Sequence, residues 1–533
     1  MGIPSYFSYI VKNHTKLIKK LSSNTIKVNN LYLDCNSIIY DSVHNIDFTK
    51  LIASDVDTII KSVCCKIDEY INQLKPDDTI FIAFDGVAPF AKLEQQRTRR
   101  YKSLYQNNIS KSIFKETKKD PWNTTAITPG TIFMNKLNTT IRQTYKDAIK
   151  YNAKRIILSP SDICGEGEHK IFEYIRTYPH KHKDVNTIIY GLDADLIMLS
   201  INHLPISNNI YLFRETPHFI SSISSELEPN ESYVIDIPEL AKIITLDMNN
   251  GNELTTKQQQ NRIYDYIFLC FFLGNDFMPH FPSVNIRTGG VDKMINAYKA
   301  TIGCTNDNLT DGKTIYWNNV RKLVEFLSNS EEDFIKKEHK LRDRREKIVL
   351  PDLTPEDKYK KFDSIPCYER SLEKFINPFK GGWENRYYKS LFNINFNDFD
   401  ERKNISVNFL EGLEWTMKYY TTGCADWRWC YKYNYPPLFS DLLHHIPLYE
   451  KELIQNKHPN PVTEMVQLCY VLPKQSLQLL PSKLYNELIK KHNNWYRTDC
   501  DFVWAYCRYF WESHIDLPVI DINELEIFVK ECK

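Results

Sequence analysis

The sequence predicts an α/β protein with a mixed, mostly parallel central sheet flanked by helices, followed by a mainly helical second region. Short apolar runs alternate with amphipathic patterns over roughly the first 300 residues, a pattern typical of helices that connect parallel strands. Seven acidic residues stand where these runs end or where helices begin. Because parallel sheets place their sites outside the carboxyl ends of the strands, we expect these acids to meet at one edge.

The expected strands cover residues 31–33, 79–84, 155–158 and 187–190, and a longer apolar stretch covers 266–273. Each is followed by one or two acids. In chain order these are Asp34, Asp85, the pair Glu166 and Glu168 in a Gly-Glu-Gly-Glu sequence, the pair Asp193 and Asp195, and Asp276.

A cluster of like charges is unstable unless cations occupy it. The simplest interpretation is a site for two hard divalent ions, as in phosphodiester cleavage. Any single acid has an alternative interpretation as a turn former or a helix N-cap. Repetition at four strand ends favours the metal site.

Bulk composition narrows the class of protein. The formal net charge is +1, so a nucleic acid must be bound through a local basic patch rather than through overall charge. The 13 cysteines lack metal-ligand spacing, which indicates reduced thiols and no zinc site. The longest apolar run, 266–274, is too short to cross a bilayer, and no signal segment is evident. We expect a soluble intracellular protein.

The chain divides by composition. Residues 1–345 carry the alternating pattern and the acids, 346–372 form a charged, Pro-containing linker, and 373–533 are aromatic-rich and mainly helical. We expect the last region to pack on the first and to complete the active site.

A basic segment follows Asp85. If the residues after Pro89 are helical, then Lys92, Gln96, Arg99 and Arg100 share one face. That face suits one terminal phosphate. The alternative is a solvated basic helix.

A second segment, 425–437, contains Trp427 and Trp429 among other aromatic residues beside two prolines. It is either a core-filling aromatic corner or a platform on which a base stacks. Periodicity does not decide between them.

With these segments in view, the chain resembles the Xrn family of 5′-to-3′ exoribonucleases. The resemblance covers essentially the whole chain, and its matching stretches are 1–7, 31–40, 85–102, 164–170, 190–196, 271–280, 411–415, the aromatic run from Trp427, 468–473 and 517–521.

The resemblance implies a PIN/FEN-like nuclease core that removes mononucleotides from single-stranded RNA with a 5′ monophosphate. It implies that all seven acids hold two Mg²⁺ ions, with Mn²⁺ able to substitute, and that the four residues from Lys92 to Arg100 form the 5′-phosphate pocket. Tyr40 and one of the two tryptophans, Trp427 or Trp429, are implied to stack on the bases.

Three departures from the family pattern matter. Tyr40 replaces a usual His, which keeps stacking but removes a titratable group, and Phe90 replaces a usual Arg. The chain stops where the nuclease core stops, and it lacks the zinc-knuckle insertion of many nuclear members. We therefore expect a minimal core of the cytoplasmic type, a monomer acting in the cytoplasm, or in a host's cytoplasm if the source is viral. The alternatives are a flap-type 5′ nuclease on DNA and an inactive RNA-binding scaffold.

Overall fold

The computed structural model describes residues 5–23, 26–46, 56–115, 122–216, 220–221 and 223–532. Within these residues the chain forms a central sheet of seven strands in the order β1-β7-β6-β5-β2-β3-β4. The strands are β1 (Ile18–Lys20), β2 (Asn30–Asp34), β3 (Thr79–Ala83), β4 (Arg155–Ser159), β5 (Thr187–Tyr190), β6 (Ile210–Glu215) and β7 (Ser232–Asp236). The strands from β2 to β6 pair in parallel, whereas β7 is antiparallel to β6 and to β1. The predicted mixed, mostly parallel sheet is confirmed.

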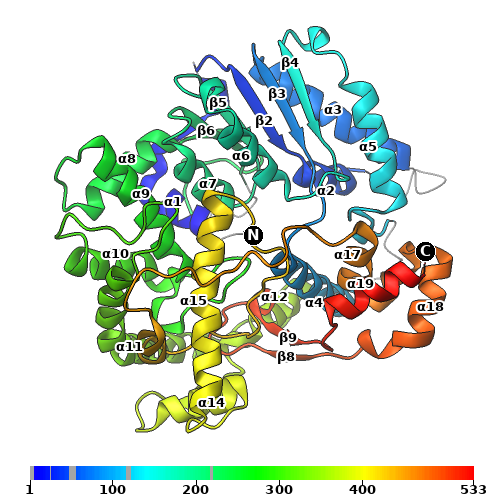
Figure 1. Cartoon of the computed structure of the whole chain (residues 1–533). Coiled ribbons are helices and arrows are strands. Elements are labelled where there is room, and N and C mark those ends of the chain that lie inside the picture. The colour runs from blue at the N-terminus through cyan, green and yellow to red at the C-terminus, as the bar shows by residue number, and fades with distance from the viewer. Residues whose placement is uncertain are drawn as a thin grey trace.

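The two faces of the sheet are buried under different helices (Figure 1). Along β2, Leu31 and Leu33 point to the face covered by α2 (Asn36–His44), α3 (Val56–Leu74) and α5 (Ile132–Thr144). Tyr32 points to the opposite face, in a cluster shared with α1 (Tyr6–His14), α6 (Gly167–Thr177) and α7 (Asp195–His203). This alternation follows from the period of two along a strand. It explains why the parallel strands read as continuous apolar runs, since neither face meets water.

The strand order brings three carboxyl ends together. From β2 the chain moves one way to β3 and β4, and then crosses to β5 on the other side of β2. In register, Asp34 lies opposite Ala83 of β3, and Leu33 lies opposite Tyr190 of β5. The region beyond β2, β3 and β5 is therefore the switch point at which ligands bind in open α/β sheets.

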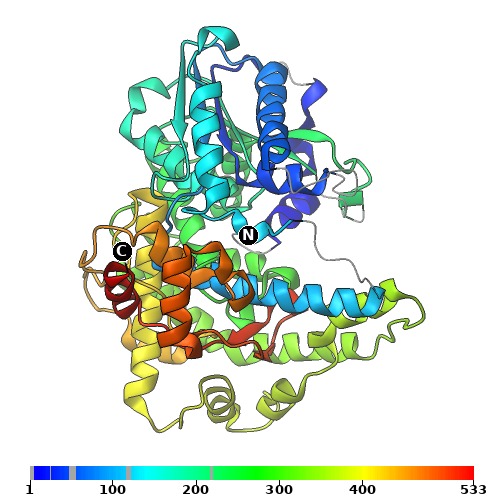
Figure 2. The same ribbon diagram turned by 90° about the vertical axis from the view of Figure 1, so that its right-hand side faces the viewer.

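Helix α4 (Phe90–Phe114) starts just after Pro89 and leaves the sheet for the helical half of the molecule. There α12 (Pro355–Asp363) and α17 (Glu464–Val471) pack against it. Figure 2 shows α4 as a long light-blue helix that runs out beneath the sheet. The expected helix after Pro89 is confirmed, and it physically joins the two halves.

The rest of the chain is mainly helical, as expected. Its remaining elements are α8 (Ile237–Met248), α9 (Thr256–Phe271), α10 (Gly290–Thr301), α11 (Trp317–Glu346), α13 (Ser371–Ile376), α14 (Trp383–Phe392), α15 (Phe399–Thr421), α16 (Phe439–His445), α18 (Ser482–His492), α19 (Ile522–Glu531) and a hairpin of β8 (Asp501–Val503) and β9 (His514–Asp516). Phe409 and Leu413 of α15 belong to the same hydrophobic cluster as Phe268 and Phe272 of the first half. The two halves therefore share one core.

The segment 346–372, expected as a linker, contains α12. Ion pairs attach its C-terminal end to α11. Arg342 of α11 and Arg370 both form ion pairs of 2.6 Å with the buried carboxylate of Glu373. Two guanidinium partners offset the desolvation of this buried carboxylate, and the loss of either one would lower the stability of the fold. In the part of the chain described, no helix combines the length and apolar character needed to span a bilayer.

Candidate active site

The first two acids meet at the end of the sheet. Asp34 is the last residue of β2, and Asp85 follows β3 by two residues. Asn36 joins their loops, since its Nδ2 donates to Asp85 Oδ2 at 2.5 Å and its Oδ1 accepts from the Asp85 backbone N–H at 3.0 Å. Asp85 Oδ1 also accepts from the Gly167 N–H at 2.7 Å. The Asp85 carboxylate is thus held by the Asn36 side chain and by the backbone at the start of α6.

The Gly-Glu-Gly-Glu sequence brings a third segment against this pair. A Cβ on Gly167 would lie 2.5 Å from Asp34 Oδ1, so only glycine allows the start of α6 to approach so closely. Gly165 adopts φ +101°, which L residues rarely tolerate. The glycines therefore let Glu166 and Glu168 join the two aspartates, as the sequence suggested.

Glu166 and Glu168 occupy the N-cap and the first turn of α6, where the helix dipole favours negative charge. Asp195 has the equivalent position as the first residue of α7, and Asp193 precedes it by two residues. Asp276 lies in the loop after α9. These placements agree with the expected acidic edge.

Lys92 lies among the acids. Its Nζ is 2.5 Å from Glu166 Oε2 and 2.8 Å from Asp276 Oδ2, and its side chain is 9% exposed. The structure therefore places Lys92 with the carboxylates, although the sequence grouped it with the phosphate-binding face. Burial of the ammonium is opposed by Asp276 and Glu166, which together raise the pKa of Lys92 well above its usual range.

The carboxylates repel one another strongly. Burial, together with the neighbouring Asp85 and Asp193, raises the pKa of Asp34 well above its ordinary value. Burial and Asp195 do the same for the pKa of Glu168. Burial first, and Asp276 second, raise the pKa of Asp195 to about 7. The cluster holds more negative charge than one lysine can balance.

Two buried oxygens of the cluster, Asp34 Oδ1 and Glu168 Oε2, have no hydrogen-bond partner in the described structure. Buried acceptors are rarely left unsatisfied, and carboxylate oxygens are the donors that hard divalent cations prefer. The residues present therefore fit divalent metal ions.

Within the described residues, no three acidic, histidine or cysteine side chains are yet arranged closely enough to enclose an ion. The Lys92 ammonium lies between Glu166 and Asp276 and pairs with both.

Two tyrosines that the sequence reasoning missed complete the cluster. From α15, Tyr419 donates to Glu166 Oε1 at 2.8 Å and Tyr420 donates to Asp195 Oδ1 at 2.7 Å. Both are buried, and the Tyr419 ring stacks on His169 with 3.7 Å between ring centroids. Adjacent helical residues reach two different acids because α15 crosses the starts of α6 and α7. A pair of tyrosines in an aromatic helix carries no sequence signal for this role.

The basic face of α4 continues away from the acids. Arg100 donates to Thr128 Oγ1 at 2.5 Å, whereas its Nη1 and the Oε1 of Gln96 are buried without a partner. Burial lowers the pKa of Arg100 to about 10, which the nearby Tyr40 opposes. Arg99 is exposed. The structure therefore brings Gln96, Arg100 and Tyr40 together, with polar atoms free to meet a ligand.

The two tryptophans have different environments. Trp429 is buried and stacks on Trp415 at 5.1 Å between ring centroids, so its indole belongs to the core. Trp427 is half-buried, and its carbonyl accepts from the Phe90 N–H at 3.0 Å. That bond places Trp427 beside the first turn of α4. Phe90, its partner, precedes Lys92 by two residues.

An acidic cluster at the switch point of an α/β sheet, with a basic helix leading from it, defines the class of metal-dependent nucleases. The profile described as the XRN 5′-3′ exonuclease N-terminus matches residues 1–216, and the Xrn1 helical domain matches 256–368 and 372–532. The chain belongs to the Xrn family, which confirms the resemblance.

The chain is similar to 5′-3′ exoribonuclease 2 of Gallus gallus, with 25% identity over all of this chain and 70% of that protein. It is also similar to 5′-3′ exoribonuclease 1 of Saccharomyces cerevisiae, with 26% identity over 90% of this chain and 40% of that protein. It thus spans well under two thirds of the exoribonuclease 1 relatives that it matches. Among solved structures, the catalytic core of Rad2 in complex with DNA substrate matches with 15% identity over 69% of this chain and 84% of that one, at a TM-score of 0.32.

Proposed function

We propose that this chain is a 5′-to-3′ exoribonuclease that hydrolyses single-stranded RNA with a 5′ monophosphate to mononucleotides. The observation that carries the proposal is the double position of Lys92. It lies on the same helical face as Gln96 and Arg100, and it also contacts Glu166 and Asp276. One helix therefore leads from the acids to the phosphate-binding face, and residues four apart lie about 6 Å from each other along it.

Each residue has a part in this proposal. Gln96, Arg99 and Arg100 hold the terminal phosphate, where Arg100 supplies charge-assisted hydrogen bonds from a rigid fork. The seven acids hold two Mg²⁺ ions, or Mn²⁺ in their place. When bound, these ions supply activation of a water and neutralisation of charge on the leaving 3′ oxygen.

Lys92 links the two parts. Its ammonium is paired with Glu166 and Asp276. Because Lys92 lies one turn before Gln96 on α4, it would stand between the acids, which would hold the ions, and the phosphate groups of the RNA. Tyr40 on α2 and Trp427 in the segment beside the first turn of α4 bracket the first bases. We further propose that the protein acts as a monomer in the cytoplasm.

The experiment compares RNAs of one sequence that differ at the 5′ end: monophosphate, triphosphate, hydroxyl and cap. We expect Mg²⁺-dependent release of mononucleotides from the monophosphate RNA and little from the others, because the pocket fits one phosphate. A DNA flap is included as the rival substrate. Faster cleavage of the flap than of the monophosphate RNA contradicts the proposal, as does release that survives complete chelation of divalent ions.

A further inference from the structure

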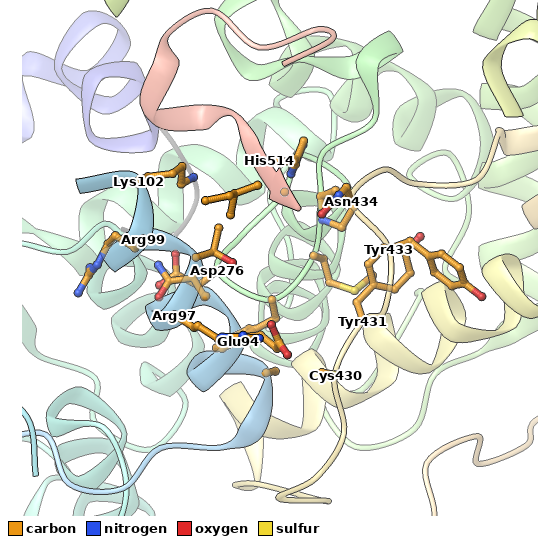
Figure 3. Close-up of a pocket in the computed structure, with 18 of the residues that line it drawn as sticks. Glu94, Arg97, Arg99, Lys102, Asp276, Cys430, Tyr431, Tyr433, Asn434 and His514 are labelled. Atoms are coloured by element: carbon orange, nitrogen blue, oxygen red, sulfur yellow. The ribbon is translucent and has the colours of Figure 1, made fainter. Parts of the chain in front are cut away.

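A cleft of about 1050 Å³ lies along α4 (Figure 3). One wall is α4 itself, including Thr98 and Lys102. The others are the loop 273–280 with 285–287, the segment 430–434 and the segment 511–522. The cleft is large enough for a nucleotide, since pockets for small ligands measure about 300–1,000 Å³.

The cleft meets the candidate active site at only two residues. Asp276 and Arg99 line it, whereas the rest of the acids and the RNA-facing residues Lys92, Gln96, Arg100, Tyr40 and Trp427 do not. The RNA-facing residues and the cleft thus lie on different flanks of α4. The cleft therefore lies beside the site, on a different side from the one on which the bases of the RNA are expected to stack.

Along α4, Arg99 connects the two flanks. It belongs to the expected phosphate face and also lines the cleft. Lys102 follows three residues later and is its neighbour on the helix surface. In Figure 3, Lys102 points from α4 toward His514, whereas the Arg99 guanidinium points to the other side of the helix. Lys102 is therefore the next cation, on the cleft side, for a phosphate that leaves Arg99.

Among the residues that the structure describes, Lys102 makes no direct ion pair with an acid. Its Nζ donates at 2.9 Å to two carbonyls, those of Trp511 and Ser513, which leaves one of its three N–H groups for another acceptor. Burial lowers the pKa of Lys102 to about 8; the charge of Glu512 opposes this shift, and that of Arg99 adds to it. An anion entering the cleft would give this ammonium a negative charge in direct contact.

The acids of the cleft compete weakly for that role. Five acids line it. Glu512 is ion-paired with Arg287 at 2.5 Å, Glu94 accepts a hydrogen bond from Tyr470, and Asp276 is paired with Lys92. Asp521 accepts from two backbone N–H groups at the start of α19, whereas Asp516 is exposed on β9. The α4 wall therefore remains the anion-attracting side.

We propose that this cleft takes up the nucleoside 5′-monophosphate product and lets it leave while the shortened RNA stays bound on the other flank of α4. The inference rests on the proposed function. Hydrolysis adds water across one P–O3′ bond, so the released nucleotide keeps its 5′ phosphate and gains a 3′ hydroxyl. That phosphate passes from Arg99 to Lys102, and the RNA's new 5′ phosphate enters the vacated pocket. Processive cleavage needs such an exit because the RNA itself fills the entrance.

The test blocks the cleft from either wall. Ser103→Trp and Asn434→Trp place an indole at exposed positions that line it. Asn107→Trp, at an exposed position of α4 that does not line the cleft, is the matched control. Rapid-quench kinetics on monophosphate RNA give two rates for each variant, the first cleavage and the cleavages after it. Thermal melts confirm that each variant folds.

We expect the first cleavage to keep its rate in both blocking variants, since the site starts empty. The later cleavages slow about tenfold, because each awaits product release. Lys102→Met weakens inhibition by added adenosine 5′-monophosphate several-fold, and Lys102→Arg restores it.

If the first and later cleavages slow equally, the cleft is not the exit for the product but belongs to the path by which RNA enters. Unchanged rates in both variants, or the same slowing in Asn107→Trp, overturn the exit role as well. The first cleavage also distinguishes this inference from the proposed function. If the unmodified protein shows no first cleavage, the proposed nuclease activity is refuted, whatever the role of the cleft.

Discussion

The Tyr419 hydroxyl donates a 2.8 Å hydrogen bond to Glu166 Oε1, although the two residues are 253 positions apart. Tyr420, the next residue, makes the equivalent bond to Asp195. The helical half of the chain thus orients acids that the sheet half supplies. A carboxylate with one oxygen held by a phenol has fewer orientations, and the second oxygen of Glu166 pairs with the Lys92 ammonium at 2.5 Å.

The first prediction concerns these tyrosines. Tyr419→Phe and Tyr420→Phe keep the rings packed but remove the hydroxyls, and partners that orient metal ligands are typically worth about 10–100-fold in metal affinity. We expect weaker Mn²⁺ binding in titration calorimetry and a higher Mg²⁺ requirement for cleavage, with little change in melting temperature. Tyr387→Phe is the control, because that buried hydroxyl bonds to the Pro436 carbonyl instead. Unchanged Mn²⁺ affinity refutes the orienting role.

The second prediction concerns the acids. Asp85→Asn and Asp193→Asn should each lower cleavage by several orders of magnitude, because the acids hold the ions on which the chemistry depends. RNA binding should change little, since the acids contact RNA only through those ions. Cleavage assays and filter binding measure the two effects. Asp162→Asn removes an exposed acid paired with Arg142 and should be neutral. Near-normal cleavage by either variant removes that residue from the site.

The third prediction concerns the 5′ end. Replacing both Arg99 and Arg100 with Ala should erase the preference for a monophosphate over a hydroxyl end, since two charge-assisted contacts are lost. Cleavage should continue at lower efficiency. Competition between the two RNAs in one reaction measures the preference, and Arg142→Ala controls for the loss of a surface cation. A double variant that discriminates like the unmodified protein places the pocket elsewhere.

Much of the sheet could be predicted because its parallel strands are buried on both faces and are followed by acids. Strands β2, β3, β4 and β5 correspond to the four expected runs. The edge strand β1 could not be foreseen, because a three-residue segment ending in two lysines forms only by pairing with β7. The reversal of β7 is likewise set by tertiary packing rather than by local pattern.

The parts of the candidate site that follow from residue spacing along a helix could be predicted from the sequence. A helical repeat places Lys92, Gln96 and Arg100 on one face, but it cannot say that the Lys92 ammonium turns into the acids. Composition likewise cannot separate Trp427 from Trp429. Only the packing of Trp429 on Trp415 distinguishes the core indole from the half-exposed one.

The fourth prediction concerns acid sensitivity. Burial lowers the pKa of His203 to about 3, of His280 to about 4 and of His514 to about 3, whereas an unfolded chain has about 6.5. Between these values the unfolded state binds more protons, so stability is present above about pH 6.5 and falls as the pH drops toward 4. Each histidine changes the unfolding free energy by at most about 1.4 kcal/mol per pH unit.

Denaturation in urea at pH 7 and pH 5 measures this effect. His203→Gln should reduce the difference between the two pH values, because the imidazole that accepts from Arg176 and donates to the Leu199 carbonyl no longer titrates. His44→Gln, at an exposed position, should leave the difference unchanged. A His203→Gln protein with the full pH dependence shows that other groups cause it.

The last prediction separates stacking from packing among the aromatic residues. Trp429→Ala should destabilise the fold by about 3–5 kcal/mol, because it empties a core position. Trp427→Ala and Tyr40→Ala should cost far less stability, since both residues are half-buried. Each should instead lower processivity and cause stalling at modest hairpins, as a stacked base is worth about 1–3 kcal/mol.

Product-length distributions measured beside thermal melts distinguish the two effects. Tyr40→Phe and Tyr40→His keep a flat ring and should be mild on both measures. The alternative is that Tyr40 only packs behind Asp34, against the cluster that includes Ile39. In that case Tyr40→Ala lowers the melting temperature while processivity per folded molecule stays the same. Because a paired base cannot enter a stack between Tyr40 and Trp427, stalling at hairpins without a loss of stability is the outcome that only the stacking role produces.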